Sequence, residues 1–421
     1  MERSFKKEVA QLRLGEGETF SGEGILAVTK ALLQSGVSYI GGYQGAPVSH
    51  LLDVMLDSSE LLDELGVHLE TPTNEAAAAA MLAASINYPM RGAVTWKSVV
   101  GTNVASDALS NLSSAGVIGG AMIVIGEDYG EGASIIQERS HAFAMKSSMC
   151  LLDPRPNLTS IVDTVEKGFE LSETSNMPVM LQLRIRACHI SGRFAARDNR
   201  SPMVSRNQLL AEPDFNIDRF CLPPSTYLQE KHKIEYRLPA AERFITENKL
   251  NEVFDGDLSD IGIITMGGLY NGVVRALERV GLSDIYGASR VPIYVMNVTY
   301  PVVPKELQEF CLGKRSVLVV EEGYPDYIEQ AVHVALRKAD VQTRVVGKEV
   351  LPKVGEYTAD VVLGGVEKFL ESEASNNLTA SLPSSAITHS NALKARAAEL
   401  LGTPIPPRPP SFCTALIPKK P

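Results

Sequence analysis

The chain has 421 residues, which at roughly 150 residues per domain predicts two or three domains. Its net charge of −10 lacks the positive excess on which non-specific nucleic-acid binding depends, so a DNA or RNA partner is disfavoured. No run of about 18 apolar residues could span a bilayer, and the charged first residues lead into no apolar signal core. We therefore expect a cytoplasmic protein without membrane contact.

Short apolar runs alternate with longer helical patterns between about residues 20 and 186, which is typical of a parallel sheet covered by helices. This alternation predicts one doubly wound α/β domain over residues 1–190. The expected helices include 48–65 and 75–88. The expected strands are 37–41, 67–70, 92–97, 120–126, 149–152 and 179–185.

A polar, proline-bearing stretch with weak periodicity follows, and we interpret residues 191–248 as a linker. The alternation then resumes and predicts a second, smaller α/β domain over residues 249–372. Its expected helices are 270–280, 305–312, 327–339 and 358–370. Its expected strands are 261–266, 292–298, 316–321 and 343–346.

The last part of the chain, residues 373–421, is rich in Ser, Asn and Ala and then in proline. The cluster Pro404–Pro410 is typical of an extended interdomain tether. Because only eleven residues follow it, we expect the chain to stop where a further domain would begin.

An acidic residue opens the alanine-rich helix that follows the second expected strand. Asn74 and Glu75 precede Ala76–Ala80, and such a pair commonly caps a helix by satisfying its first amides. The alternative is that Glu75 faces a ligand, because a helix of small side chains suits a place where another element approaches closely. On that interpretation the alanine face lies at an intersubunit or interdomain surface beside a cleft.

Glycines and polar residues also follow other strands at the same predicted sheet edge, where open α/β folds place their sites. The turn Gly41–Ser49 is either a ligand-binding loop or a plain tight turn, and Lys97 is either an anion ligand or a solvated side chain. Asp128 and the run Gln137–His141 lie at this edge too. The seven histidines show no metal-ligand spacing, and the five cysteines include no C-x-x-C pair, so no metal or iron–sulfur site is expected on this chain.

Together these segments resemble the thiamine-diphosphate-dependent 2-oxoacid:ferredoxin oxidoreductases, and most closely the α subunit of the indolepyruvate type. The segments that carry the resemblance are Gly41–Ser49, Asn74-Glu75, Lys97 with Gly101–Asp107, Gln137–Arg139, Pro178–Arg186, Tyr300-Pro301 and Val319–Glu322. The resemblance covers nearly the whole chain. It implies a pyrimidine-binding domain followed by a domain like the carboxy-terminal domain of transketolases.

The resemblance also implies roles for single residues. The glutamate that matches Glu75 hydrogen-bonds N1′ of the cofactor's pyrimidine and thereby promotes loss of the thiazolium C2 proton. Cofactor contacts are expected at Gly45, Ala46, Pro47 and Asn103 as well, and substrate contacts at Lys97, Gln137 and Arg139. The implied reaction is oxidative decarboxylation of an indolepyruvate-like 2-oxoacid, with electrons passed to ferredoxin or another acceptor and with coenzyme A as a candidate acyl acceptor.

The chain departs from the family pattern at two points. Ala46 stands where the family commonly has a threonine that meets the substrate, and the diphosphate-binding G-D-G…N-N motif is absent, since Asn376-Asn377 lie too far from Asp255–Asp257 to complete it. We therefore expect a partner chain to hold the diphosphate and its Mg²⁺, iron–sulfur clusters on a partner, and an oligomer. The rival hypothesis is a non-catalytic assembly or regulatory subunit that keeps the fold, and a nucleotide-binding ligase ranks third.

Overall fold

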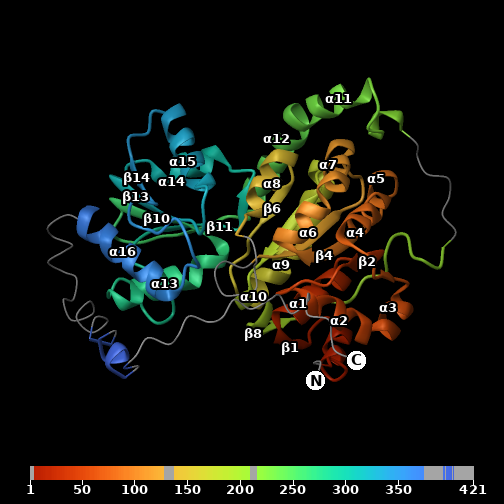
Figure 1. Cartoon of the computed structure of the whole chain (residues 1–421), viewed down its shortest axis with the longest axis horizontal. Helices are drawn as coiled ribbons and strands as arrows, with labels where there is room; N and C mark the ends of the chain where they lie inside the picture. Colours follow the sequence, from red (N-terminus) through yellow and green to blue (C-terminus); the bar gives the residue numbers. More distant parts are fainter. Residues whose placement is uncertain are drawn as a thin grey trace.

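A computed structural model describes residues 4–127, 137–208, 216–373, 392–393, 395–400 and 402. Two sheets with helices on their faces stand side by side (Figure 1), so the predicted α/β architecture is confirmed. Within the described ranges, no helix is long and apolar enough to cross a membrane.

The first sheet has seven strands in the order β12-β6-β7-β5-β4-β2-β3. Its central strands are buried along their whole length, which explains why they are continuous apolar runs. All neighbours pair in parallel except β12, which runs antiparallel to β6. The strands are β2 (Tyr39–Gly42), β3 (His68–Glu70), β4 (Gly92–Lys97), β5 (Ala121–Gly126), β6 (Cys150–Leu152), β7 (Val179–Leu183) and β12 (Val298–Tyr300).

Helices cover both faces of this sheet and bury two separate hydrophobic clusters. One face carries α1 (Gly24–Gln34), α2 (Ser49–Asp57), α3 (Ser59–Leu65) and α9 (Leu158–Ser175), with α10 (Ile185–His189) against α1. The other carries α4 (Glu75–Met81), α5 (Ala84–Asn87), α6 (Ser98–Val104), α7 (Ser106–Ala115) and α8 (Ser140–Ser147).

Both helices expected in the first half of this domain are in fact two helices. The first breaks at Ser58, whose hydroxyl donates to the carbonyl of Val54 and so competes with regular helix bonding. The second breaks between Met81 and Ala84.

The alanine helix α4 uses its small side chains inside the chain. Ala78 and Ala79 are buried in the same cluster as Trp96, and α4 packs against α7. The chain's own core covers Ala79, so this residue does not lie at the intersubunit or interdomain surface expected for the alanine face, and for the rest of that face the expectation stays a prediction. Ala77 and Ala80 are exposed.

The segment 191–248, expected to be a linker, contains regular structure. β8 (Ser191–Ala195) pairs antiparallel with β1 (Thr19–Glu23). Further along lie α11 (Ser225–His232) and α12 (Leu238–Glu247), with Ala241 and Ile245 buried in the same cluster as α1 and α9. Because so few of its apolar side chains are buried, the segment shows little periodicity although it packs on the domain.

The second sheet has five strands in the order β14-β13-β10-β11-β9, with β9 antiparallel at the edge. Its strands are β9 (Glu252–Phe254), β10 (Ile261–Met266), β11 (Ile293–Met296), β13 (Ser316–Val320) and β14 (Arg344–Val346). Two pairs of helices accompany this sheet. α13 (Tyr270–Arg279) packs with α16 (Ala359–Glu373), and α14 (Pro304–Cys311) packs with α15 (Tyr327–Lys338).

The chain passes directly from one sheet to the other at Asn297. The single strand expected over 292–298 is divided, because β11 belongs to the second sheet and β12 to the first. The Asn297 side chain donates to the Leu250 carbonyl and to Glu252, both at 2.8 Å, and accepts from the Arg155 amide at 3.0 Å. Its buried amide group thus fixes the junction between the sheets.

We predict that Gly267→Ala destabilises this junction strongly. A Cβ at Gly267 would lie 1.9 Å from the Asp153 carbonyl oxygen and 2.8 Å from Asn297 Oδ1, so the sheets would have to move apart. The expected cost is about 3 kcal/mol or more in the free energy of unfolding, measured by urea denaturation. Gly364→Ala, in α16 with no atom within 4 Å of the added carbon, is the control and should be neutral or stabilising. Equal stabilities for the two variants would contradict the close contact.

Candidate functional site

The loop after β2 lies directly on the ends of β4 and β5. A Cβ at Gly45 would come within 2.5 Å of Lys97 Cβ, and one at Gly126 within 2.5 Å of Pro47 Cδ. The peptide bond between Ala46 and Pro47 is cis. Glycine is therefore required at position 45 for steric reasons, because only a residue without a side chain lets this loop approach the strand end that carries Lys97.

Glu75 lies at the same carboxyl edge, in the first turn of α4. Asn74 performs the capping, since its Oδ1 accepts the amide hydrogen of Ala77 at 2.8 Å. Glu75 is only 7% exposed, and no hydrogen bond or ion pair from a described residue reaches its carboxylate. The expectation that this pair caps the helix therefore holds for Asn74, and the Glu75 carboxylate remains available to another partner.

Lys97 directly precedes α6, and Asn103 lies near the end of this helix. Lys97 ends β4 and is 5% exposed. Asn103 is exposed, and its side-chain amide donates to the Val99 carbonyl at 2.9 Å and to Glu138 at 2.8 Å. This second bond ties α6 to the segment that contains Gln137 and Arg139.

Gln137 and Arg139 face different surroundings. Gln137 is exposed, whereas the Arg139 side chain is 2% exposed. The Arg139 guanidinium donates to Glu321 at 2.6 Å and to the Pro325 carbonyl at 2.7 Å, and it lies 5.3 Å from the Tyr327 ring. Arg139 is thus engaged by the second domain, and its role as a substrate ligand stays a prediction.

Sequence reasoning missed Glu127, which organises this edge. Its Oε2 accepts from the Ser98 hydroxyl and from the Ser140 amide, both at 2.9 Å, and the two serine hydroxyls are 2.6 Å apart. Because Ser98 and Ser140 open α6 and α8, Glu127 fixes the neighbouring Lys97 and Arg139. A carboxylate directly after a buried strand was the available signal. Asp128, which was singled out instead, lies outside the described residues.

No group of three or more His, Cys, Asp or Glu side chains is placed to bind a metal ion in the part of the chain that the structure describes.

His141, next to Ser140, is buried and neutral. Burial, and to a smaller extent the nearby Arg139, lowers the pKa of His141 to about 3. Its ring stacks on Tyr327 at 5.2 Å between centroids.

We predict that His141 makes the protein acid-sensitive. In the unfolded chain this histidine takes a proton near its ordinary pKa of about 6.5, whereas the folded chain resists it, so stability falls as pH drops from about 6.5 towards about 3. His141→Phe keeps a ring against Tyr327 and removes the titrating group, and with it this contribution to the acid sensitivity. The loss of unfolding free energy between pH 7 and 4.5 should shrink by about 2 kcal/mol. His232→Phe is the control, because His232 is exposed and contacts Tyr236. An identical acid slope in wild type and His141→Phe would contradict the prediction.

Comparisons with known proteins find relatives over most of this chain. The IorA subunit of indolepyruvate oxidoreductase from Methanothermobacter marburgensis is 29% identical over 357 residues, 83% of this chain and 54% of that protein. The same subunit from Pyrococcus abyssi is 26% identical over 392 residues, 92% of this chain and 56% of that protein. The chain thus spans about half the length of the curated relatives it matches. No protein-family model matches it.

Solved structures show the same fold at low identity. A 2-oxoglutarate:ferredoxin oxidoreductase from Magnetococcus marinus, with 2-oxoglutarate, coenzyme A and succinyl-CoA bound, has a TM-score of 0.61 at 16% identity, over 83% of this chain and 65% of that one. A split-gene transketolase in an inactive β4 tetramer has a TM-score of 0.50 at 17% identity, over 83% and 99%. The resemblance seen in the motifs is confirmed: the chain is homologous to the IorA subunits of indolepyruvate oxidoreductases and shares the fold of 2-oxoacid:ferredoxin oxidoreductases.

Proposed function

We propose that this chain is the pyrimidine-side subunit of a thiamine-diphosphate-dependent oxidoreductase that acts on an indolepyruvate-like 2-oxoacid. The observation that carries the proposal is the Glu75 carboxylate, buried at the sheet edge and reached by no hydrogen bond from the described residues. In this proposal residues 1–190 form the pyrimidine-binding domain and residues 249–372 the transketolase C-terminal-like domain.

The residues present fit the pyrimidine half of the cofactor. A ring nitrogen that must share a proton with the protein needs a carboxyl group away from water, and Glu75 offers one that is not used for capping. Gly45 approaches β4 so closely that no side chain fits between this loop and Lys97. Thiamine diphosphate, when bound, supplies the carbon nucleophile for attack on a 2-oxoacid.

The chain's own residues then have distinct roles. Glu75 holds and returns the proton at N1′ of the pyrimidine. Gly45, Ala46, Pro47 and Asn103 line the cofactor. Lys97 and Gln137 bind the substrate carboxylate. Arg139, which is held by Glu321, assists substrate binding through its positive charge without direct contact.

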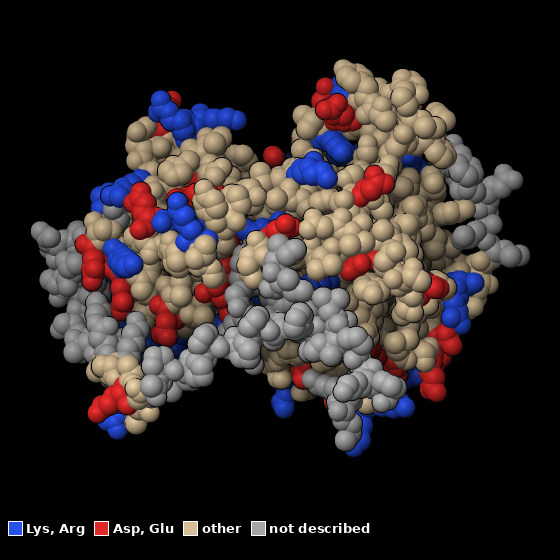
Figure 2. All heavy atoms as spheres, in the orientation of Figure 1, with Lys and Arg blue, Asp and Glu red and all other residues tan. Residues whose placement is uncertain are grey.

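Apolar side chains around this edge support a partner that completes the site. Tyr43, Val100, Val104 and Met145 are between 42% and 47% exposed. Val100 and Val104 lie on α6 beside Asn103, and Figure 2 shows few charged side chains over α6 and α7. We assign the diphosphate, the Mg²⁺ and the iron–sulfur clusters to partner chains that dock here and pass electrons to a ferredoxin-type carrier, with coenzyme A as the candidate acyl acceptor.

A non-catalytic assembly subunit is the second candidate, and Ala46 is the observation that favours it. Alanine has no hydroxyl to offer a substrate at the position where the resembled family has threonine. Variants at Glu75 separate the two candidates, because an assembly subunit needs no carboxyl group there.

We predict that Glu75→Gln abolishes most activity without unfolding the protein. In the complex reconstituted with its partner chain, turnover and exchange of the cofactor C2 proton, followed by NMR, should both fall by at least ~10²-fold. The unfolding free energy of the isolated chain should change by less than about 0.5 kcal/mol, because no described residue bonds to the carboxylate.

Two control variants sharpen this experiment. Glu60→Gln alters an exposed glutamate in the first turn of α3 and should leave both rates unchanged. Asn74→Ala removes the cap of α4 and should cost about 1 kcal/mol of stability. Unchanged C2 exchange in Glu75→Gln would favour the assembly subunit.

We also predict that the isolated chain binds thiamine diphosphate weakly. The Mg²⁺-bridged diphosphate supplies most charged contacts of the cofactor, and we assign those contacts to the partner. Titration calorimetry with the cofactor and Mg²⁺ should show no micromolar binding to the chain alone and clear binding to the complex. Micromolar affinity of the chain alone would show that it carries the whole site.

A further inference from the structure

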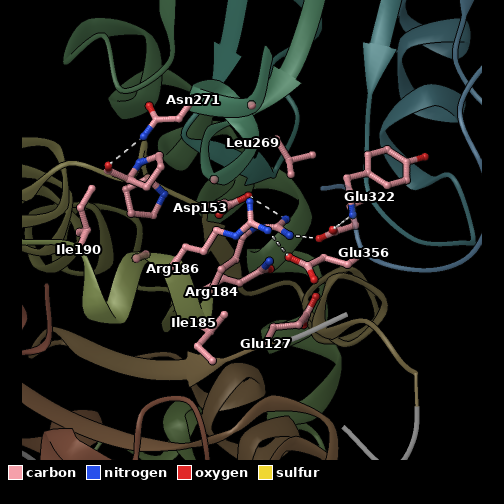
Figure 3. A pocket seen from close by; sticks show the side chains of 17 residues that line it. Glu127, Asp153, Arg184, Ile185, Arg186, Ile190, Leu269, Asn271, Glu322 and Glu356 are labelled. Atoms are coloured by element: carbon pink, nitrogen blue, oxygen red, sulfur yellow. Dashed lines mark hydrogen bonds and ion pairs between the residues drawn. The ribbon is translucent and has the colours of Figure 1, made fainter. Parts of the chain in front are cut away.

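A cavity of about 120 Å³ opens between the carboxyl ends of the two sheets, away from Glu75 and the loop after β2. Glu127, Asp153 and Arg184 reach it from the ends of β5, β6 and β7. Gly268, after β10, also lines it. Glu322 reaches it from beyond the end of β13 (Figure 3). Strand ends and domain interfaces are the places where α/β proteins bind small molecules.

The charges in this cavity do not balance. Four carboxylates line it, from Glu127, Asp153, Glu322 and Glu356, against the guanidinium groups of Arg184 and Arg186. Arg184 lies between Glu322, with which it forms a close ion pair, and Asp153 at 3.6 Å (Figure 3). Arg186 pairs with Glu356 at 2.9 Å. Burial accordingly raises the pKa of Asp153. A cation bound in the cavity would offset this excess of negative charge and favour the ionised form of Asp153 over the protonated one.

Buried polar atoms on the cavity wall lack hydrogen-bond partners. Among the described residues, Asp153 Oδ2 accepts no hydrogen bond, and Gln182 Nε2 and Arg184 Nε donate none. Asp153 and Gln182 are at least 98% buried. Because buried polar groups in folded proteins are almost always satisfied, these atoms call for a molecule that offers both a donor and an acceptor.

The rest of the wall is apolar and sets the size of that molecule. Ile185, Ile190 and Leu269 lie around the charged cluster, with Pro154 and Pro156 beside them. A cavity of about 150 Å³ admits benzene, so this one suits about five non-hydrogen atoms. Gly268 keeps it open, because a Cβ there would lie 2.6 Å from both Asp153 Oδ1 and Arg184 Nε.

We propose that this cavity binds a small organic cation, a primary ammonium with a hydroxyl or carbonyl oxygen a few carbons away. The ammonium donates to Asp153 and Glu322, the oxygen accepts from Gln182 and Arg184, and the short carbon chain lies against Ile185, Ile190 and Leu269. This site is independent of the function proposed for Glu75.

The test compares molecules of nearly equal size and different charge. The probe is 3-aminopropan-1-ol, with propane-1,3-diol as the neutral analogue, 3-hydroxypropionate as the anion, and ammonium and potassium chloride as simple cations, all at matched ionic strength. The full chain carries methyl-labelled isoleucine and leucine for NMR. We expect saturable shifts at Ile185, Ile190 and Leu269 with the amino alcohol only, and an accompanying rise in thermal midpoint.

Variants locate the binding. Asp153→Asn should weaken the probe at least about tenfold, since it removes a charged hydrogen-bond partner. Gln182→Leu should weaken it severalfold. Asp163→Asn, on the exposed face of α9, is the matched control and should bind like wild type.

The wild-type spectra alone can overturn the proposal, whatever the variants do. No saturable shift at the three methyl groups would show that the cavity binds none of the probes, and equal shifts with the diol or the anion would show that it does not select a cation; either result would contradict the proposal. Shifts that ammonium or potassium reproduce would show a site for simple cations instead and would contradict the organic ligand.

Discussion

Ion pairs between the two sheets are the interaction on which the rest of this structure depends. Arg139 reaches Glu321 across the interface with both side chains almost fully buried, Arg184 reaches Glu322, and Arg155 holds Glu252 at 2.6 Å. Buried ion pairs add little net stability over apolar contacts. Removing one partner nevertheless costs about 3–5 kcal/mol, because it leaves the other charge buried without a counter-charge. They therefore specify how the domains meet more than they strengthen the contact.

This domain contact determines the geometry of the candidate site, although the site belongs to the first domain. Glu321 fixes Arg139, whose neighbour Ser140 bonds to both Ser98 and Glu127. Ser98 in turn follows Lys97 at the end of β4. A shift of the second domain would thus be transmitted to Lys97 through Arg139, Ser140 and Ser98.

The sequence predicts the strands well where burial on both faces makes them continuous apolar runs, as in β4 and β5. It fails where the deciding partner is distant. After Pro292 the run 293–298 contains no glycine or proline, so the hydrogen bonds of Asn297 to Leu250, Glu252 and Arg155 are what divide it between two sheets. The helices of 191–248 were missed for a related reason, since they bury few side chains. At the candidate site, Glu75 and Gly45 could be singled out because local rules govern helix starts and tight loops, and their roles stay predictions, whereas Glu127 acts only through residues that the fold brings to it.

Glu127 also connects the two places where this molecule can hold a ligand. One of its oxygens accepts from Ser98 and Ser140, beside Lys97 and Arg139, while the residue also lines the cavity between the sheets. A carboxylate in this position responds to charge on either side. A cation in the cavity would attract the Glu127 carboxylate and hence act on its bonds to α6 and α8. Occupancy of the cavity would therefore bias the arrangement of Lys97 through one side chain and two serines, without any contact between the ligands themselves.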